Sequence, residues 1–356
     1  MPKETPQLPL DFFEASAERA LELVDAQKQA ALAKERMEQV AAGRCNIRPF
    51  PTLATQPFRS ELTIEQNSLF VSNGFRDDFF SREWMVKHPS SGEPVTRRVS
   101  VGKVNETDRG RGVLTQTHQD VFYQLLQLWD KQGYPVIGER QDEVYGYFTI
   151  SAYKLVTTLR NSDNAREYRR VQVLLQDLAS IPIVLENTYT WQGLVDREQF
   201  TLLSSVRWNE KAVDKTTRRP TTEGVSAVTI LFSIRVTEGF LNKHIKTLLA
   251  TPYKSLREAR SKQPSEIARL LYPFLDAQLA TKPEYHSRLA PLAERFGLRV
   301  FPYKSQRRDQ FTPAMNALNG HPIHGGKFVL EARLDKAADD KDYVLVANAV
   351  GRKACR

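Results

Sequence analysis

The sequence predicts an α+β protein with two tandem winged-helix domains, preceded by a long N-terminal helix and an extended linker. Two observations predict this fold. Helices followed by strand-like segments, in the order of a winged helix, occur twice along the chain. The chain also has 356 residues, 41% apolar and 26% charged, as in a globular protein long enough for about two domains. The expected boundaries are 1–58 for the helix and linker, 59–224 for the first winged-helix domain with its N-terminal extension, and 225–356 for the second.

The N-terminal segment 11–42 is predicted to be one helix, because helix-forming residues dominate it and no proline or glycine interrupts it before Gly43. Its apolar positions follow the 3-4 spacing of a short heptad seam, but most are alanine. Three roles for this helix stay open: it packs onto the rest of the protein, it forms a separate arm, or it pairs with the same helix of a second copy. Three prolines then make an extended linker. They are Pro49, Pro51 and Pro57.

The first domain is predicted to begin its core with a helix over Gln119–Trp129, which is apolar on most sides. Thr115 is a suitable N-cap residue with His118 three positions later, and Ser151 is a suitable cap for a shorter second helix. We expect Tyr153, Val156 and Leu159 to face inward from that helix.

A third helix is predicted over about Ala165–Ala179, and it has two distinct faces. Apolar residues recur at helical spacing, and a set of arginines is offset from them by roughly 140°. The strand-like runs Ile181–Glu186 and Gln199–Trp208 are then expected to form the wing hairpin. The second helix of a helix–turn–helix enters the major groove, so the arginine face is a candidate DNA contact. Its residues are Arg166, Arg169 and Arg170.

The second domain is predicted to repeat this order. A Val- and Ile-rich strand spans Val225–Val236, and helices follow over Glu238–Leu249, Ser265–Leu271 and Arg288–Phe296, the last closed by Gly297. A basic helix over Lys304–Leu318 contains Pro313, so we expect it to be kinked or shorter. The strands Lys327–Leu334 and Tyr343–Val350, joined by a polar run, form the second hairpin.

Positive charge is unevenly distributed along the chain. Lys and Arg number 51 against 42 Asp and Glu, a formal net charge of +9. Residues 1–44 carry 6 basic and 8 acidic side chains, so the remainder carries +11, and the segment 240–310 holds 14 basic against 6 acidic residues. Phosphate contacts need several cations on one surface, so this distribution favours duplex DNA as the partner.

Several other classes of protein are not expected. No apolar run is long enough to span a bilayer, and the N-terminus lacks the pattern of a signal peptide, so we expect a cytoplasmic protein without a membrane partner. The two cysteines, Cys45 and Cys355, exclude a disulfide framework and a cysteine-rich zinc module.

Motifs of catalysis are also not found. The nearest approach to a phosphate-binding loop ends in Gly326-Lys327, but His321 stands where the first glycine is required and Phe328 replaces Ser or Thr. Two residues separate His321 from His324 in a proline-containing turn, which suits a polar turn better than a metal site. No serine lies in a nucleophile-elbow pattern. We therefore expect no enzyme activity, no metal and no cofactor.

From Leu114 onward the chain resembles the iteron-type replication initiators of bacterial plasmids. Four segments carry the resemblance. They are Leu114–Leu126, Ile150–Leu155 before the arginine helix, Val228–Ile234 followed by Phe240-Leu241, and Pro264–Tyr272, which is similar to the family's Ser-x-x-Ala-x-x-Leu-Tyr segment.

The resemblance implies a function. Such proteins have two winged helices, bind direct repeats at an origin, melt adjacent AT-rich DNA and recruit the host replication initiator and the replicative helicase, without nuclease or ATPase activity. Inactive homodimers form through the N-terminal winged helix, and the C-terminal one makes the main DNA contacts. Carried onto this chain, the second reading helix contributes Lys304, Gln306, Arg307, Arg308 and Gln310, and the second hairpin contributes Lys327 and Arg333.

Two other readings remain open. A winged-helix transcription regulator has the same fold but does not open an origin. A DNA nickase or nuclease requires metal-dependent cleavage, for which the carboxylates must converge in space.

Overall fold

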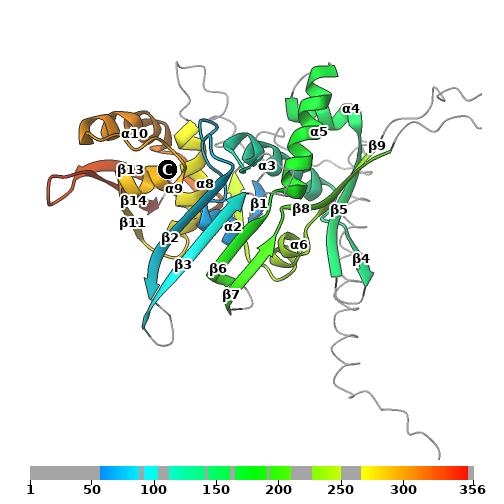
Figure 1. Ribbon diagram of the computed structural model, residues 1–356, viewed down its shortest axis with the longest axis horizontal. Coiled ribbons are helices and arrows are strands. Elements are labelled where there is room, and N and C mark those ends of the chain that lie inside the picture. Colours follow the sequence, from blue (N-terminus) through cyan, green and yellow to red (C-terminus); the bar gives the residue numbers. More distant parts are fainter. Residues whose placement is uncertain are drawn as a thin grey trace, which may run out of the picture.

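The computed structural model describes residues 57–87, 92–102, 112–140, 143–160, 165–190, 193–209, 227–249 and 266–351 (Figure 1). These form a mixture of helices and antiparallel sheets, so the α+β class is confirmed. The predicted helix 11–42 and the linker up to residue 56 lie outside the described residues. So does most of the polar segment 209–224.

Helices α3 (Gln116–Lys131), α4 (Ala152–Arg160) and α5 (Ala165–Ser180) confirm the three predicted helices of the first domain. The Thr115 backbone N–H donates to His118 Nδ1 (3.0 Å) at the start of α3, and the Lys154 N–H donates to Ser151 Oγ (3.2 Å) in α4, so both caps form. The inward orientation of Tyr153 was wrong, because its side chain is 59% exposed. Leu155 is buried instead.

A four-stranded sheet, in the order β4-β5-β9-β8, packs with these helices. Its strands are β4 (Val136–Arg140), β5 (Glu143–Ser151), β8 (Leu203–Asn209) and β9 (Ala227–Phe232). Strand β9 pairs with β5 and β8, so the segment after 225 extends the sheet that follows the first three helices. The predicted domain boundary at residue 225 stays a prediction. Strand β9, which follows it, is hydrogen-bonded to β5 and β8, which precede it.

The predicted wing hairpin of the first domain was wrong. Strand β6 (Ile183–Thr190) pairs with β7 (Gly193–Phe200) and β3 (Pro94–Gly102), in a second sheet of order β2-β3-β6-β7 that includes β2 (Phe79–Lys87). The run Gln199–Trp208 is divided at Leu202, which is buried, and its second half is β8. Strand β3, one partner of β6, lies about 80 residues earlier in the chain, so periodicity alone does not reveal this sheet.

One further strand–helix prediction was also wrong. After β9, Ser233 caps α6 (Ile234–Leu241) by accepting the Val236 N–H at 3.4 Å, so the predicted strand over Val225–Val236 ends early. The second half of the predicted helix Glu238–Leu249 is instead β10 (Ile245–Leu249). This strand pairs with β1 (Pro57–Glu61), which continues into α2 (Leu62–Asn67).

The C-terminal part, residues 266–351, has the order helix, strand, helix, helix, two-residue strand, hairpin. Its elements are α8 (Glu266–Leu279), β11 (Glu284–Arg288), α9 (Leu289–Arg295), α10 (Lys304–Leu318), β12 (Pro322–Ile323), a 3-10 turn (His324–Gly326), β13 (Phe328–Lys336) and β14 (Tyr343–Gly351). Strand β11, which the sequence did not predict, pairs with β14, and the sheet order is β11-β14-β13-β12. Gly297 ends α9 as predicted, at φ +59°, a conformation that favours glycine.

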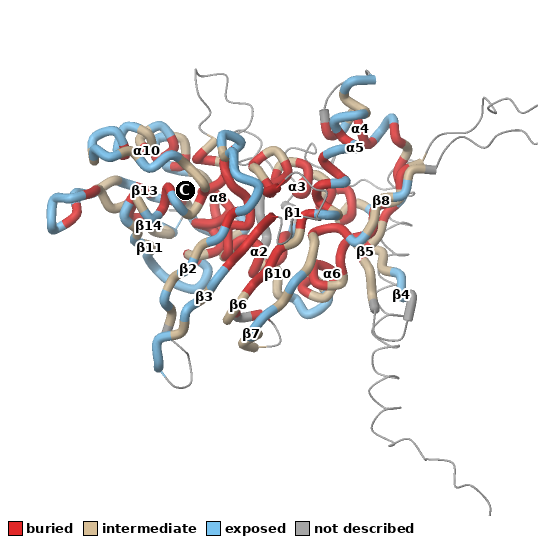
Figure 2. The backbone as a smooth tube through the Cα atoms, viewed as in Figure 1, coloured by how far each residue is buried: buried red, intermediate tan, exposed pale blue. Residues whose placement is uncertain are grey.

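The two halves share one core (Figure 2). Phe122 of α3 and Leu271 of α8 belong to the same buried cluster, and Arg269 Nη1 of α8 forms an ion pair with Asp120 Oδ2 of α3 at 2.8 Å. Figure 1 shows α5 and α10 at opposite ends of the molecule, on the same upper side, with α3 and α8 between them. The shared core therefore fixes the relative position of the two basic helices.

Candidate nucleic-acid interface

Helix α10 has one apolar face and one polar face. Phe311, Ala314 and Leu318 are buried at helical spacing, whereas Gln306 and Arg308 are exposed. The helix runs through Pro313 to its full predicted length, so the expected shortening was wrong. Pro313 is exposed and has no N–H, so this turn lacks one backbone hydrogen bond without leaving a buried group unsatisfied.

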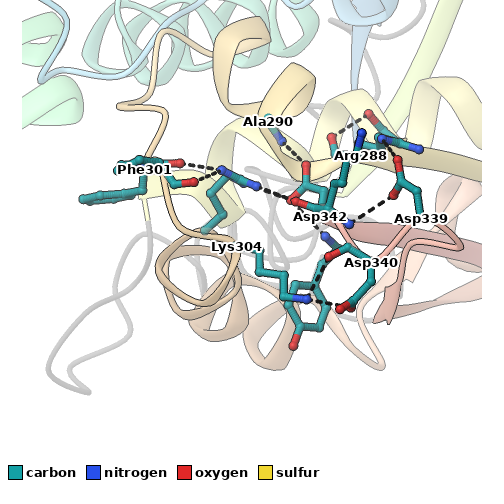
Figure 3. Close-up of polar contacts among 12 residues, drawn as sticks. Arg288, Ala290, Phe301, Lys304, Asp339, Asp340 and Asp342 are labelled. Atoms are coloured by element: carbon teal, nitrogen blue, oxygen red, sulfur yellow. Dashed lines mark hydrogen bonds and ion pairs between the residues drawn. The ribbon is translucent and has the colours of Figure 1, made fainter.

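Arg307 lies on the buried side of α10, with 8% of its area exposed. Its Nε donates to Asp342 Oδ1 at 2.9 Å, and its remaining donors reach the backbone carbonyls of Phe301 (2.5 Å), Pro302 (3.1 Å) and Lys341 (3.0 Å) (Figure 3). Four of the five N–H groups of the guanidinium are therefore bonded within the protein. Arg307 is removed from the candidate DNA-contacting residues, because its side chain is buried and most of its donors are already bonded within the protein.

Asp342 joins three elements through this pair. Its Oδ1 also accepts the Tyr343 N–H (2.9 Å) at the start of β14, and its Oδ2 accepts the Ala290 N–H (3.0 Å) at the start of α9. Arg307 and Asp342 thus hold the beginning of α10, the beginning of α9 and the end of the hairpin loop in one arrangement. Both side chains are buried, so this contact is part of the scaffold of the site.

The loop 337–342 between β13 and β14 makes two further ion pairs, both exposed (Figure 3). Asp340 Oδ1 lies 2.6 Å from Lys304 Nζ, and Asp339 Oδ2 lies 2.9 Å from Arg288 Nη1. The Lys304 hydrogen bond lowers the pKa of Asp340. The pKa of Asp339 is lowered by the Lys341 backbone N–H and also by Arg288. Both carboxylates are therefore anions beside the start of α10.

The other predicted residues of this half are spread over the hairpin and helix. Arg308 is exposed, donates to Asp309 Oδ1 (2.9–3.0 Å) and lies over the Tyr343 ring, 5.7 Å from its centroid. Gln310 is half-buried and donates to the Arg299 carbonyl at 3.3 Å. Arg333 is exposed on β13 and pairs with Asp335 (3.0 Å).

Lys327 is exposed but lies before the first residue of β13, at the opposite end from the loop 337–342. A nine-residue strand is about 26 Å long at about 3.3 Å per step. Lys304 and Arg308, four residues apart, therefore lie on the same side of α10, whereas Gln306, two residues from each, points to another side of the helix. Lys327 lies apart from all three.

In the first half, Arg166, Arg169 and Arg170 are all exposed on α5, and Val171, Leu174, Leu175 and Leu178 are buried, so both predicted faces form. Arg170 Nη1 lies 3.4 Å from Glu167 Oε1. Arg166 and Arg169 form no ion pair with any described residue.

The arginine face of α5 borders a cleft of about 770 Å³. Its other wall comes from the segment Phe75–Asp78 and the start of α3, so Asp77 and Asp78 face the arginines across it. Beside the cleft, His118 Nδ1 accepts the Thr115 N–H and its Nε2 lies 3.2 Å from Asp177 Oδ2. This contact fixes the start of α3 against α5, and therefore fixes one wall of the cleft against the other.

Two features of the site escaped sequence reasoning. Tyr303, the N-cap residue of α10, has 68% of its area exposed. The loop aspartates also reach α10 and Arg288 from about 35 to 50 residues away along the chain. Tyr303 could have been found from its place immediately before a basic helix. No local sequence pattern predicts the ion pairs of Asp339 and Asp340 with Arg288 and Lys304.

Within the described ranges, no group of three His, Cys, Asp or Glu side chains is placed to hold a metal ion. Nor is any described helix long and apolar enough to cross a membrane.

Comparison with known proteins finds a likeness to solved structures, among them two of RctB. No protein-family model and no curated protein matches the sequence. A crystal structure of domains 2 and 3 of RctB aligns with 82% of this chain and 99% of that chain, at 9% identity and a TM-score of 0.44. A second structure of RctB domains 2–3 aligns with 81% of this chain and 96% of that chain, at 10% identity and a TM-score of 0.40. Both TM-scores are below 0.5, so the proposals below depend on this chain's own residues.

Proposed function

We propose that this protein is a sequence-specific double-stranded DNA-binding replication initiator. It binds direct repeats at a plasmid origin, promotes opening of adjacent AT-rich DNA and recruits the host replication initiator and the replicative helicase. The observation that carries DNA binding is the exposed surface of α10, where Gln306 and Arg308 lie beside a β-hairpin. The replication role depends on the resemblance of the segments from Leu114 onward to the iteron-type initiators.

The proposal treats α8, α9 and α10 with the hairpin β13–β14 as the second winged helix, and α10 as its reading helix. The first consists of α3, α4 and α5 with the pair β8–β9, and the hairpin β6–β7 is an insertion into it. Arg308 suits guanine O6 and N7, and Gln306 suits adenine N6 and N7. Arg166, Arg169 and Arg170 contact phosphates in the other part of the binding site.

We add Tyr303, which is exposed, to the proposed DNA contacts. Arg307 is buried, so we propose that it positions α10 and does not contact DNA. Lys327 and Arg333 stay as outer phosphate contacts on the hairpin. The protein is proposed to act without catalysis, cofactor or metal, in the cytoplasm where plasmid DNA lies, with homodimerisation as an inactive state.

Footprinting on the DNA that flanks the gene tests the proposal. We expect protected direct repeats of roughly two helical turns each, and an affinity that falls steeply with salt. Arg308→Ala should lose the preference for the repeat, and the matched exposed variant Arg197→Ala on β7, which makes the same change of net charge, should keep it. Absence of any protected repeat would overturn DNA recognition at an origin.

Replication itself needs a second assay. A plasmid that carries only the gene and its flanking DNA should replicate in a host without another initiator for it. Protected repeats without replication would identify the protein as a transcription regulator instead. Metal-dependent cleavage of supercoiled plasmid by the purified protein would identify a nickase or nuclease.

A further inference from the structure

The surface beside the start of α10 contains two cations that the free protein holds with its own carboxylates. Arg288 ends β11 and Lys304 begins α10, and the loop 337–342 presents Asp339 to the first and Asp340 to the second. Sequence reasoning did not select Arg288, because it lies 16 residues before Lys304 in a segment where no strand was expected.

The contact distances are those of charge-assisted hydrogen bonds to an anionic oxygen. Lys304 Nζ lies 2.6 Å from Asp340 Oδ1, and Arg288 Nη1 lies 2.9 Å from Asp339 Oδ2. A phosphate oxygen accepts from Lys and Arg at the same distances. The two carboxylates therefore stand where phosphate oxygens would lie.

The three ion pairs of this loop differ in burial. The side chains of Arg288 and Asp339 are 48% and 36% exposed, and those of Lys304 and Asp340 are 36% and 68% exposed, whereas Arg307 and Asp342 are 9% and 5% exposed. Exposed pairs contribute little to stability, so an incoming anion can replace them. The buried pair remains and keeps the loop anchored while the outer two exchange.

We propose that Arg288 and Lys304 form a phosphate-binding pair that Asp339 and Asp340 occupy in the free protein and that a DNA phosphate takes over on binding. This inference rests on the proposed DNA-binding function and adds Arg288 to its contacts. The aspartates then act as competitors that lower the affinity for the sugar–phosphate backbone, the sequence-independent part of DNA binding.

Asparagine variants remove the charge and preserve the turn. In Asp339→Asn, the side-chain oxygen still accepts the Lys341 N–H, which lies 3.1 Å from it. In Asp340→Asn, Lys304 keeps its hydrogen bond to the residue 340 carbonyl, at 2.8 Å. Asp196→Asn, on the exposed surface of β7, makes the same change of net charge far along the chain and is the matched control.

The test measures binding of the full-length protein to a fluorescent 20-bp duplex of scrambled sequence, at 50 mM and 300 mM salt. We expect Asp339→Asn and Asp340→Asn to bind about two- to fivefold more tightly than the wild type at 50 mM, with the difference largely removed at 300 mM by screening. Arg288→Gln and Lys304→Gln should bind more weakly, and each should reduce the salt slope by about one unit. In a Lys304→Gln background, Asp340→Asn should give no gain.

Two outcomes are distinguishable. If the wild type binds the duplex but Asp340→Asn matches Asp196→Asn, or gains equally without Lys304, the competing role of the loop is overturned and DNA binding stands. If the wild type binds no duplex at 50 mM salt, the proposed function itself fails.

Discussion

The two basic helices, α5 and α10, differ in how far their positively charged side chains are exposed. On α5, all three arginines are exposed, and the stripe of Val171, Leu174, Leu175 and Leu178 is buried in the core. On α10, Arg307 is buried, Lys304 is paired with the hairpin loop, and Arg308 and Gln306 are exposed. The number of basic residues in a segment therefore does not give the positive charge that is exposed to a binding partner.

The difference arises from what packs beside each helix. The β13–β14 loop brings three aspartates to the start of α10, and one of them is buried with Arg307. The acidic wall near α5 faces its arginines across an open cleft, and among the described residues no ion pair joins Asp77 or Asp78 to the arginines of α5. We therefore expect α10 to supply sequence preference and α5 to supply general attraction.

The largest expected effect is on stability. Arg307→Ala should lower the free energy of unfolding by about 3–5 kcal/mol, because it leaves Asp342 buried without its cation. Urea denaturation followed by circular dichroism measures it. Arg308→Ala, one residue away and exposed, is the control and should leave stability nearly unchanged. Equal effects of the two variants would contradict the assignment of Arg307 to the scaffold.

The second prediction concerns α2, which lies between α3 of the first half and α8 of the second. Glu65 of α2 is buried, and burial raises its pKa to about 7, while Ser60 Oγ (2.5 Å) and Tyr123 Oη (2.6 Å) donate to its carboxylate. Because the folded-state pKa exceeds the unfolded value near 4.5, its contribution to stability is full below about pH 4.5 and is lost as the pH rises to about 7.

Between pH 4.5 and 8 the wild type should therefore lose about 3 kcal/mol more than Glu65→Gln, which cannot ionise. Urea unfolding of both proteins across this range measures the difference. Since α2 packs against α8 and hydrogen-bonds to α3, we expect both halves to unfold in one transition. Parallel pH profiles would show that Glu65 is not the titrating group.

The third prediction addresses sequence preference. Arg308→Ala and Gln306→Ala should each weaken binding to a duplex selected from a random library by about 10- to 100-fold, and should change binding to a scrambled duplex far less. Fluorescence anisotropy with both duplexes measures the ratio. If both duplexes lose affinity equally, α10 contacts phosphate and does not read bases.

The smallest expected effect is on α5. Arg166→Ala, Arg169→Ala and Arg170→Ala should each reduce the slope of log affinity against log salt by about one unit, for any duplex sequence. Arg170 pairs with Glu167, so its effect should be the smallest of the three. A sequence-dependent loss would give α5 a reading role and would remove the contrast with α10.

Local patterns predicted the helices well. The stripe from Val171 to Leu178 marked α5, and Thr115 with His118 marked the start of α3, because caps and helical periodicity act within a few residues. The strands were harder. The run after Gln199 reads as one strand, yet it is divided at Leu202, since its two halves pair with different sheets.

The site shows the same limit. Adjacent residues on a helix differ by about 100° in direction, so a one-residue difference separates the buried Arg307 from the exposed Arg308. Sequence reasoning included both, because a basic stretch with Pro313 inside it gave no clear apolar register.

By itself, the sequence determined where the basic helices lie, which stripe of α5 faces the core and how unevenly the charge is distributed. Only the tertiary structure decided which cations are exposed. Asp339, Asp340 and Asp342 reach Arg288, Lys304 and Arg307 from a loop far along the chain, and the energy of an ion pair depends on distance and burial, neither of which is encoded locally.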